Sequence, residues 1–327
     1  MFDLSNPIYQ NADAAREHLE TIQWPHGPVC PHCGNVDAAR ITKLAGKSTR
    51  PGVYKCKECR KPFSVTVGTV FERSHIPLHK WVAATHLMAA SKKGISAHQM
   101  HRMLGVTYKT AWFMEHRIRE AMAVSPKDRG AMGGPGKTVE ADETYWGAKD
   151  DQTPPPRRKA EGPRTTKPKP GFYKRTIMAL VERGGEVRSF HVETANIMTV
   201  KEVLFRNVDR KSTLYTDQAQ FYKQPGKDFD THRSVNHSKD EWVRWEGEAK
   251  VHTNTIENVF SVFKRGMKGT YQHCGEAHLH RYLAEFDFRY NRRSAVGVED
   301  NERHEMLLAA IRGKRLTYRR IGEARIA

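Results

Sequence analysis

Four of the five cysteines stand in two pairs, and their spacing constrains the N-terminal part of the chain more than any other feature. One pair is Cys30 and Cys33, the other is Cys56 and Cys59, and 22 residues separate the pairs. Two Cys-x-x-Cys turns at this separation can place four thiolates tetrahedrally around one Zn²⁺. A redox dithiol of the thioredoxin type would need a βαβ setting, which is not visible here. We therefore interpret residues 1–70 as an N-terminal segment and a zinc ribbon with one structural Zn²⁺.

The net charge points to a polyanionic partner. The 327 residues include 55 Lys and Arg against 37 Asp and Glu, which gives a formal net charge of +18. Each phosphate that such a surface neutralises releases a condensed counterion, so nucleic acid is the favoured partner. A hydrophobic content of 38% is enough for a sizeable core and excludes a wholly disordered chain. The sequence has no apolar run of membrane-spanning length and no apolar signal segment, so we expect a cytoplasmic protein without a membrane partner.

Residues 75–124 have the pattern of a DNA-binding helix-turn-helix. A first helix is expected to end before Gly105, and Thr107 would cap a second helix that runs from 108 to 122. The second helix carries an apolar stripe that should be buried, formed by Ala111, Met114, Ile118 and Ala121. The residues left to face outward and to contact DNA are Lys109, Trp112, His116, Arg117 and Arg119. The alternative is a plain helical hairpin with a solvated basic face.

A stretch rich in Gly and Pro at 125–136 marks a domain boundary, and the pattern changes after it. Residues 137–295 predict strands and helices in the order β-β-β-α-β-α-β-α, which indicates an α/β domain. A basic, Pro-rich insert occupies 147–171, and a basic C-terminal tail is expected at 296–327.

Three acidic residues stand where strand ends and a helix should converge. Asp142 lies on the first strand of the α/β domain, and its neighbour Glu143 should point to the opposite face. Asp217 directly ends a short strand, at the place where open α/β sheets present their chemistry. Glu257 lies on an amphipathic helix, and Lys264 lies two turns further on, about 20° from Glu257 around the helix axis.

Carboxylates that converge on one point repel one another unless a cation is present. Two Mg²⁺ or Mn²⁺ ions about 4 Å apart would satisfy the three, and they would support an in-line phosphoryl displacement. Lys264 is suited to steer a substrate phosphate as a point charge. Structural alternatives remain open. Asn254 and Glu257 have the spacing of a capping box, Asp217 could begin the next helix, and Asp142 could lie on the surface.

Five features together resemble a known family. They are the zinc ribbon and the segments "ISAHQMHRMLGVTYKTAWFMEHRIREAM", "VEADETYWG", "LYTDQAQFY" and "HTNTIENVFSVFKRGMKGTYQH". Through these segments, the chain between about Pro25 and Arg293 resembles the ISXO2-like (IS1595) family of bacterial insertion-sequence DDE transposases.

The resemblance implies a ribonuclease H-like catalytic domain with a mixed sheet and flanking helices. It implies that Asp142, Asp217 and Glu257 are the acidic trio that holds Mg²⁺, and that Lys264 is the basic residue after the third acid. Some members of the family are described with Asn in the third place, so Asn254 is a lesser candidate beside Glu257.

The resemblance also implies a reaction: hydrolysis at the ends of a transposable element, followed by transfer of the 3′-hydroxyl strand into target DNA. The ribbon and the helix-turn-helix would recognise the terminal inverted repeats. The enzyme would act on double-stranded DNA in the bacterial nucleoid, as a homodimer or a larger assembly on paired ends. Two other classes remain. One is a DNA-binding regulator whose carboxylates are structural, and the other is a ribonuclease H-like, structure-specific nuclease that cleaves without strand transfer.

Overall fold

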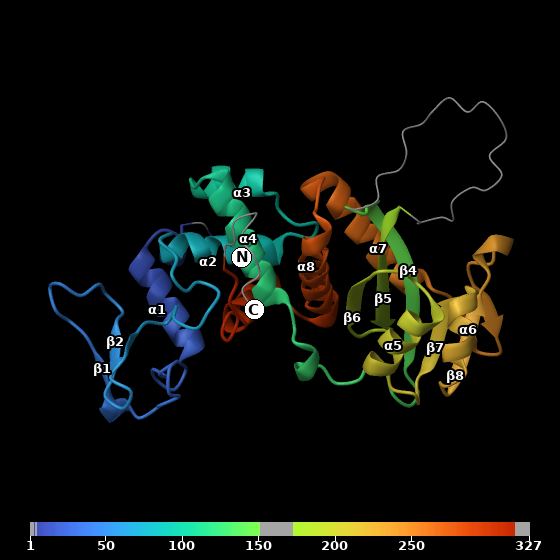
Figure 1. Ribbon diagram of the computed structural model, residues 1–327, viewed down its shortest axis with the longest axis horizontal. Helices are drawn as coiled ribbons and strands as arrows, with labels where there is room; N and C mark the ends of the chain where they lie inside the picture. Colours follow the sequence, from blue (N-terminus) through green and yellow to red (C-terminus); the bar gives the residue numbers. More distant parts are fainter. Residues whose placement is uncertain (1–2, 4, 151–172, 318–327) are drawn as a thin grey trace. The chain divides into compact units, whose positions relative to one another are not determined.

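The structure, a computed structural model, describes residues 3, 5–150 and 173–317 (Figure 1). The chain divides into two compact units. The first comprises Met1–Ala123 together with Arg292–Ala327, and the second comprises Val124–Asn291. Most of the basic insert expected at 147–171 lies outside the described residues.

A small antiparallel sheet in the first unit carries part of the expected zinc ribbon. Helix α1 (Ala12–Gln23) precedes the sheet, whose strands are β1 (Ile41–Lys43), β2 (Tyr54–Cys56) and β3 (Pro62–Phe63), in the order β1-β2-β3. Trp24, which follows α1, packs edge-on against the rings of Tyr54 and Phe63. An apolar cluster of this size is too small to hold a module together alone, so the ribbon needs a metal or a cross-link.

Four further helices complete the first unit. They are α2 (Leu78–Ala90), α3 (Ala97–Leu104), α4 (Tyr108–Met122) and α9 (Asp300–Ala309). Gly105 ends α3 in the left-handed conformation, with φ at +57°, where an L side chain would be strained. Thr107 then caps α4 by accepting a hydrogen bond from the Thr110 backbone N–H, at 3.2 Å. The two helices and the turn that the sequence predicts are therefore present.

Helix α9 changes the expected course of the C-terminus. The sequence predicts a basic tail at 296–327, but α9 packs against α2 and α1 within the first unit. Leu307 and Leu308 are buried, and His304 Nε2 lies 3.0 Å from Thr85 Oγ1. Burial of these side chains makes this segment part of the first unit's core.

A five-stranded mixed sheet forms the centre of the second unit. Its strands are β4 (Thr138–Ala148), β5 (Lys174–Glu182), β6 (Val187–Val192), β7 (Thr213–Asp217) and β8 (Thr231–Val235), in the order β6-β5-β4-β7-β8. Strands β4, β5 and β6 pair antiparallel, whereas β7 and β8 run parallel to β4. Three antiparallel strands followed by two parallel ones form the mixed sheet expected of a ribonuclease H-like domain.

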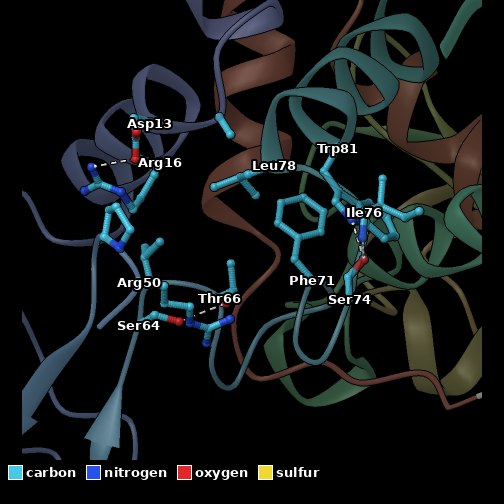
Figure 2. Close-up of a pocket in the computed structure, with 13 residues that line it drawn as sticks. Asp13, Arg16, Arg50, Ser64, Thr66, Phe71, Ser74, Ile76, Leu78 and Trp81 are labelled. Atoms are coloured by element: carbon cyan, nitrogen blue, oxygen red, sulfur yellow. Dashed lines mark hydrogen bonds and ion pairs between the residues drawn. The ribbon is translucent and has the colours of Figure 1, made fainter. Parts of the chain in front are cut away.

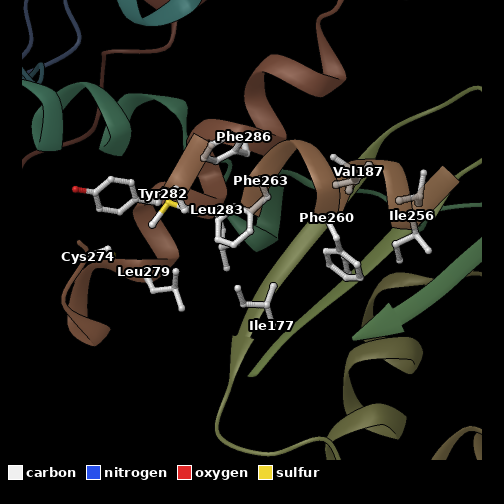
Figure 3. Close-up of a cluster of buried hydrophobic side chains, with 14 residues drawn as sticks. Ile177, Val187, Ile256, Phe260, Phe263, Cys274, Leu279, Tyr282, Leu283 and Phe286 are labelled. Atoms are coloured by element: carbon white, nitrogen blue, oxygen red, sulfur yellow. The ribbon is translucent and has the colours of Figure 1, made fainter. Parts of the chain in front are cut away.

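Helices cover both faces of this sheet. Helices α5 (Ile197–Asn207) and α6 (Gln220–Gly226) lie over one face, and α7 (Asn254–Gly266) and α8 (Leu279–Asn291) lie over the other (Figure 1). Phe260 and Phe263 of α7 pack with Phe286 of α8 and with Ile177 of β5 (Figure 3). Strand β5 is buried on both faces of the sheet, and this explains why its sequence contains a continuous apolar run.

A two-stranded hairpin that the sequence analysis did not predict joins β8 to α7. Its strands are β9 (Arg244–Glu246) and β10 (Ala249–Val251). The strand and helix order predicted for residues 137–295 is otherwise present, and α8 is a further helix at its end that the sequence analysis did not predict. Among the described residues, no helix is both long enough and apolar enough to cross a membrane.

Candidate active site and zinc site

Three carboxylates meet at one end of the central sheet. Asp142 and Glu143 are neighbours on β4, and Asp217 is the last residue of β7. Oxygen atoms of the three side chains lie within 4.8 Å of one another. The structure thus brings together Asp142 and Asp217 of the predicted trio, and it adds Glu143.

The register of the strands explains this meeting. Strands β4 and β7 run parallel and pair at Glu140 and Tyr215, so Asp142 and Asp217 continue that register on the same face of the sheet. Glu143 belongs to the other face, as predicted, and there its carboxylate accepts a hydrogen bond from the Tyr222 hydroxyl at 3.1 Å. An oxygen of Glu143 nevertheless lies within 4.8 Å of oxygens of Asp142 and of Asp217, the residue at which β7 ends.

The three carboxylates of this cluster have the same charge and are partly buried, and the pKa of each is raised. Burial, followed by the charges of Glu143 and Asp217, raises the pKa of Asp142 well above its ordinary value. Burial and the charge of Asp217 raise the pKa of Glu143 to about 7. Burial also raises the pKa of Asp217. A bound divalent cation would remove this repulsion, so this donor set of hard carboxylate oxygens fits Mg²⁺ or Mn²⁺.

Glu257 lies beside this cluster but is not part of the 4.8 Å group. Its carboxylate accepts a hydrogen bond from Thr253 Oγ1 at 3.1 Å and lies 3.3 Å from His237 Nε2. It adds to the rise in the Asp142 pKa as the smallest of the causes. Glu257 therefore faces the site from α7, at greater distance than Glu143.

The structure does not contain the capping box between Asn254 and Glu257 that the sequence left open. Thr253, not Asn254, is the N-cap of α7, and the Thr253 side chain accepts no capping hydrogen bond from the helix backbone. Asn254 is the first residue of the helix, is exposed, and donates its backbone N–H to His252 Nδ1 at 3.3 Å.

A buried residue that the sequence analysis missed fixes the start of α7. Glu140, two residues before Asp142, accepts hydrogen bonds from the Ile256 backbone N–H at 3.0 Å and from Thr255 Oγ1 at 2.9 Å. Arg183 pairs with the same carboxylate at 2.8 Å. Glu140 thus ties the strand of Asp142 to the helix of Glu257. Alternation along β4 gives the signal, because Glu140 and Asp142 share one face.

Lys264 also lies on α7, in its last turn. Burial lowers the pKa of Lys264, while the negative charge of Asp142 opposes that change. Lys264 is thus within range of the charge of Asp142, and its separation of seven residues puts it on the same edge of α7 as Glu257.

The four paired cysteines converge in the first unit, and their sulfur atoms lie within 4.8 Å of one another. The Cys30 and Cys59 sulfurs are 3.6 Å apart, and those of Cys33 and Cys56 are 3.7 Å apart. Four sulfurs about 2.3 Å from a central Zn²⁺ would be about 3.8 Å apart in a tetrahedron. The donor set and its spacing therefore fit zinc, as the sequence predicts.

The prediction that five residues of α4 face outward to contact DNA is wrong for three of them. His116, Arg117 and Arg119 are buried. Arg119 pairs with Glu115 at 3.2 Å, and these side chains are 0% and 2% exposed. Arg117 donates a hydrogen bond to the Glu72 carbonyl at 2.7 Å. These arginines contribute to the interior of the first unit, so we do not propose that they read DNA.

The other two residues of that set remain more accessible. Lys109 is exposed at the start of α4, and Trp112 is half-buried with its ring 4.2 Å from the ring of His116. Helix packing explains the difference: α4 lies against both α2 and α3, so its buried surface is wider than one apolar stripe.

A pocket of about 240 Å³ lies in the first unit between α1 and residues 64–81 (Figure 2). Trp81 lines it and donates its indole N–H to Ser74 Oγ at 2.9 Å. The charged pair on its wall, Asp13 and Arg16, is already joined at 3.3 Å. Among the described residues, no group of converging carboxylates or thiolates lines this pocket.

Comparison with known proteins assigns both regions. Residues 133–291 match the ISXO2-like transposase domain of the IS1595 group, and residues 10–62 match the transposase zinc-ribbon domain of the same group. These two matches, on a chain with a four-cysteine cluster and a mixed sheet that carries clustered carboxylates, identify a transposase of the DDE class. Within that class, the chain belongs to the ISXO2-like, or IS1595, family of insertion-sequence transposases.

One relative is similar over most of its length. It is an uncharacterized protein in the transposable element ISH50 of Halobacterium salinarum, 29% identical over 283 residues, which are 83% of this chain and 88% of the relative. Among solved structures, the Mos1 strand transfer complex (12% identity, TM-score 0.22) and a pre-cleavage Mos1 transpososome (10%, TM-score 0.19) each align with 66% of this chain. The alignments cover 77% and 78% of those chains. Likeness at this level is too weak to support a conclusion.

Proposed function

We propose that this transposase binds the terminal inverted repeats of its element and catalyses strand cleavage and strand transfer by in-line phosphoryl transfer. The observation that carries the proposal is the meeting of Asp142, Glu143 and Asp217 at one end of the sheet, within 4.8 Å. Like charges gathered in a partly buried place are costly to a fold, and such an arrangement is typical of a functional site.

Asp142 and Asp217 would hold a divalent cation, Mg²⁺ or Mn²⁺, with Glu143 as the third nearby carboxylate and Glu257 beside them for a second ion. When bound, the cations supply Lewis-acid activation of the attacking oxygen and stabilise the charge on the leaving oxygen. The family also leaves Asn254 as a lesser candidate for the third position.

The other groups of the site orient the substrate. Lys264 would carry a positive charge within range of the charge of Asp142, and it would draw a DNA phosphate toward the carboxylates. Glu140 holds the N-terminus of α7 to β4, and so keeps Glu257 and Lys264 in position opposite Asp142.

DNA binding is supported by the net charge of +18. We propose that the zinc ribbon and the α3–α4 region contact the element's ends, with Lys109 as the exposed basic residue of α4. The substrate is double-stranded DNA of the nucleoid, and two or more copies of the chain would hold paired ends. If Lys109 reads a base edge, Lys109→Ala costs about 1–3 kcal/mol of binding on the correct repeat and little on random DNA.

The test is incubation of the full chain with duplex DNA that carries its element's inverted repeat and flanking sequence, with Mg²⁺ or Mn²⁺. The proposal predicts metal-dependent nicks at the repeat end and joined products. Nicks without joining would instead indicate a structure-specific nuclease. Sequence-specific binding without any nick would indicate a regulator.

A further inference from the structure

Two tryptophans on and before the β9–β10 hairpin are exposed to solvent. Trp242 is 52% exposed and Trp245 is 65% exposed. An indole ring that stays in water forgoes a large gain from burial, so two exposed indoles only three residues apart in the sequence indicate a contact surface. We call Trp242, Trp245 and His237 the tryptophan platform.

One tryptophan of the platform, Trp242, is linked to the candidate active site through His237. The Trp242 ring packs on the His237 ring, with centroids 4.8 Å apart and planes 37° apart. His237 Nε2 in turn lies 3.3 Å from Glu257 Oε1 and 3.1 Å from Thr253 Oγ1. Trp242 is therefore separated from a carboxylate of the site by one side chain.

The charges around the platform do not favour the DNA backbone as its ligand. Arg233 pairs with Glu246 at 3.0 Å, and Arg244 pairs with Glu241 at 3.1 Å and with Glu246 at 2.6 Å. Four basic and four acidic residues balance one another between 231 and 251. An aromatic surface with little net charge suits the flat face of a nucleobase better than it suits a phosphate.

We propose that Trp242 and Trp245 stack against unpaired nucleobases of the DNA strand that is cut at the carboxylate cluster. This inference rests on the proposed function. A base that leaves the duplex next to the reacting phosphate loses its stacking neighbours, and an aromatic side chain can replace them. The platform thus gives the enzyme a preference for DNA that is open at the element's end.

The experiment compares two labelled DNAs of one sequence, a fully paired duplex and a fork with several unpaired bases at the end. Binding of the full chain is measured by fluorescence anisotropy without divalent metal, so that no cleavage occurs. Wild type should prefer the fork. Trp242→Leu and Trp245→Leu should each lose about tenfold in affinity for the fork and less than about twofold for the duplex.

Matched variants distinguish the effect of an aromatic ring from the effect of removing any exposed apolar side chain. Trp242→Phe keeps an aromatic face and should stay within about threefold of wild type on the fork. Met198→Ala removes another exposed apolar side chain of the same unit, 76% exposed, and should change neither affinity. Equal losses on both DNAs, or no loss on the fork, would overturn the proposal.

Two further measurements distinguish base stacking by the platform from the proposed function and from a contact between copies of the chain. Because binding needs no chemistry, fork preference in a chain that fails to nick end DNA would support the platform while the proposed function fails. A change of oligomeric state in the Trp242→Leu/Trp245→Leu variant, with fork preference intact, would instead identify a contact between copies of the chain and overturn the inference.

Discussion

Charged side chains are buried in both units, but their charges are compensated in different ways. In α4 of the first unit, Glu115 and Arg119 are opposite in sign and pair at 3.2 Å. At the sheet end of the second unit, Asp142, Glu143 and Asp217 have the same sign. Among the described residues, none of these three forms an ion pair with a basic side chain within 4 Å. The first arrangement is complete within the fold, whereas the second needs a cation from outside.

The cysteine cluster also needs a cation from outside the fold. Of all the substitutions considered, we expect those at the cysteines to have the largest effect. Structural zinc contributes on the order of 10–16 kcal/mol of apparent binding free energy to small modules. Cys30→Ser, or a strong chelator, should therefore unfold the ribbon and abolish recognition of element ends, while the second unit stays folded. Zinc content and hydrogen exchange of residues 24–63 measure this. One zinc per chain in the Cys30→Ser variant would contradict the assignment.

At the carboxylate cluster, loss of one charge should remove activity but not binding. Asp142→Asn and Asp217→Asn keep the shape of the side chain, yet each should lower strand cleavage by about three orders of magnitude or more. Binding to end DNA should stay near the wild-type level. Glu202→Gln, which changes an exposed residue paired with Arg206 at 2.8 Å, is the matched control. Normal cleavage by either amide variant would show that the cluster does not hold the catalytic metal.

In α4, by contrast, loss of one charge should lower the free energy of unfolding. Arg119→Met leaves the buried Glu115 carboxylate without this partner, which should cost about 3–5 kcal/mol of unfolding free energy. The double variant Glu115→Leu/Arg119→Met removes both charges and should recover most of that loss. Chemical denaturation of the first unit measures both. A neutral Arg119→Met variant would mean that this pair is not what holds α4.

The cluster also predicts a dependence of stability on pH in metal-free buffer. The pKa of Glu143 is about 7 in the folded chain and 4.5 without the fold, so the folded state binds the proton more tightly. Stability is therefore highest below pH 4.5 as far as this group is concerned. It should fall by about 3 kcal/mol as the pH rises through 7. Thermal unfolding of the second unit with EDTA, and with Mg²⁺ as the comparison, checks this sign. A stability that is equal in both buffers at pH 8 would contradict it.

The sequence allowed the carboxylate site to be predicted because its geometry follows from strand direction. Asp217 ends a strand, where open α/β sheets present their chemistry, and Asp142 lies on the first strand of the same domain, so both could be identified as candidates. The contribution of Glu143 could not, because alternation places it on the other face. Its proximity to Asp217 depends on how β4 and β7 pair, which is a property of the assembled sheet.

The errors in the helical unit have a related cause. Hydrophobic periodicity finds apolar stripes, but it does not register charged residues that are buried as pairs. Glu115 and Arg119 stand four residues apart on α4, and this spacing is the only local signal of their pairing. Helix α9 was missed for the same reason, since its buried positions include Arg303 and His304 beside Leu307 and Leu308.

The central claim is that the carboxylate cluster is a site for divalent cations, and calorimetric titration of the full chain with Mn²⁺ tests it most directly. The zinc content of each variant is measured in parallel, so that loss of the ribbon is not mistaken for loss of this site. Wild type and Glu202→Gln should bind Mn²⁺, and Asp142→Asn/Asp217→Asn should not, with one zinc per chain in all three. Binding of Mn²⁺ by the double variant with wild-type affinity would contradict the account.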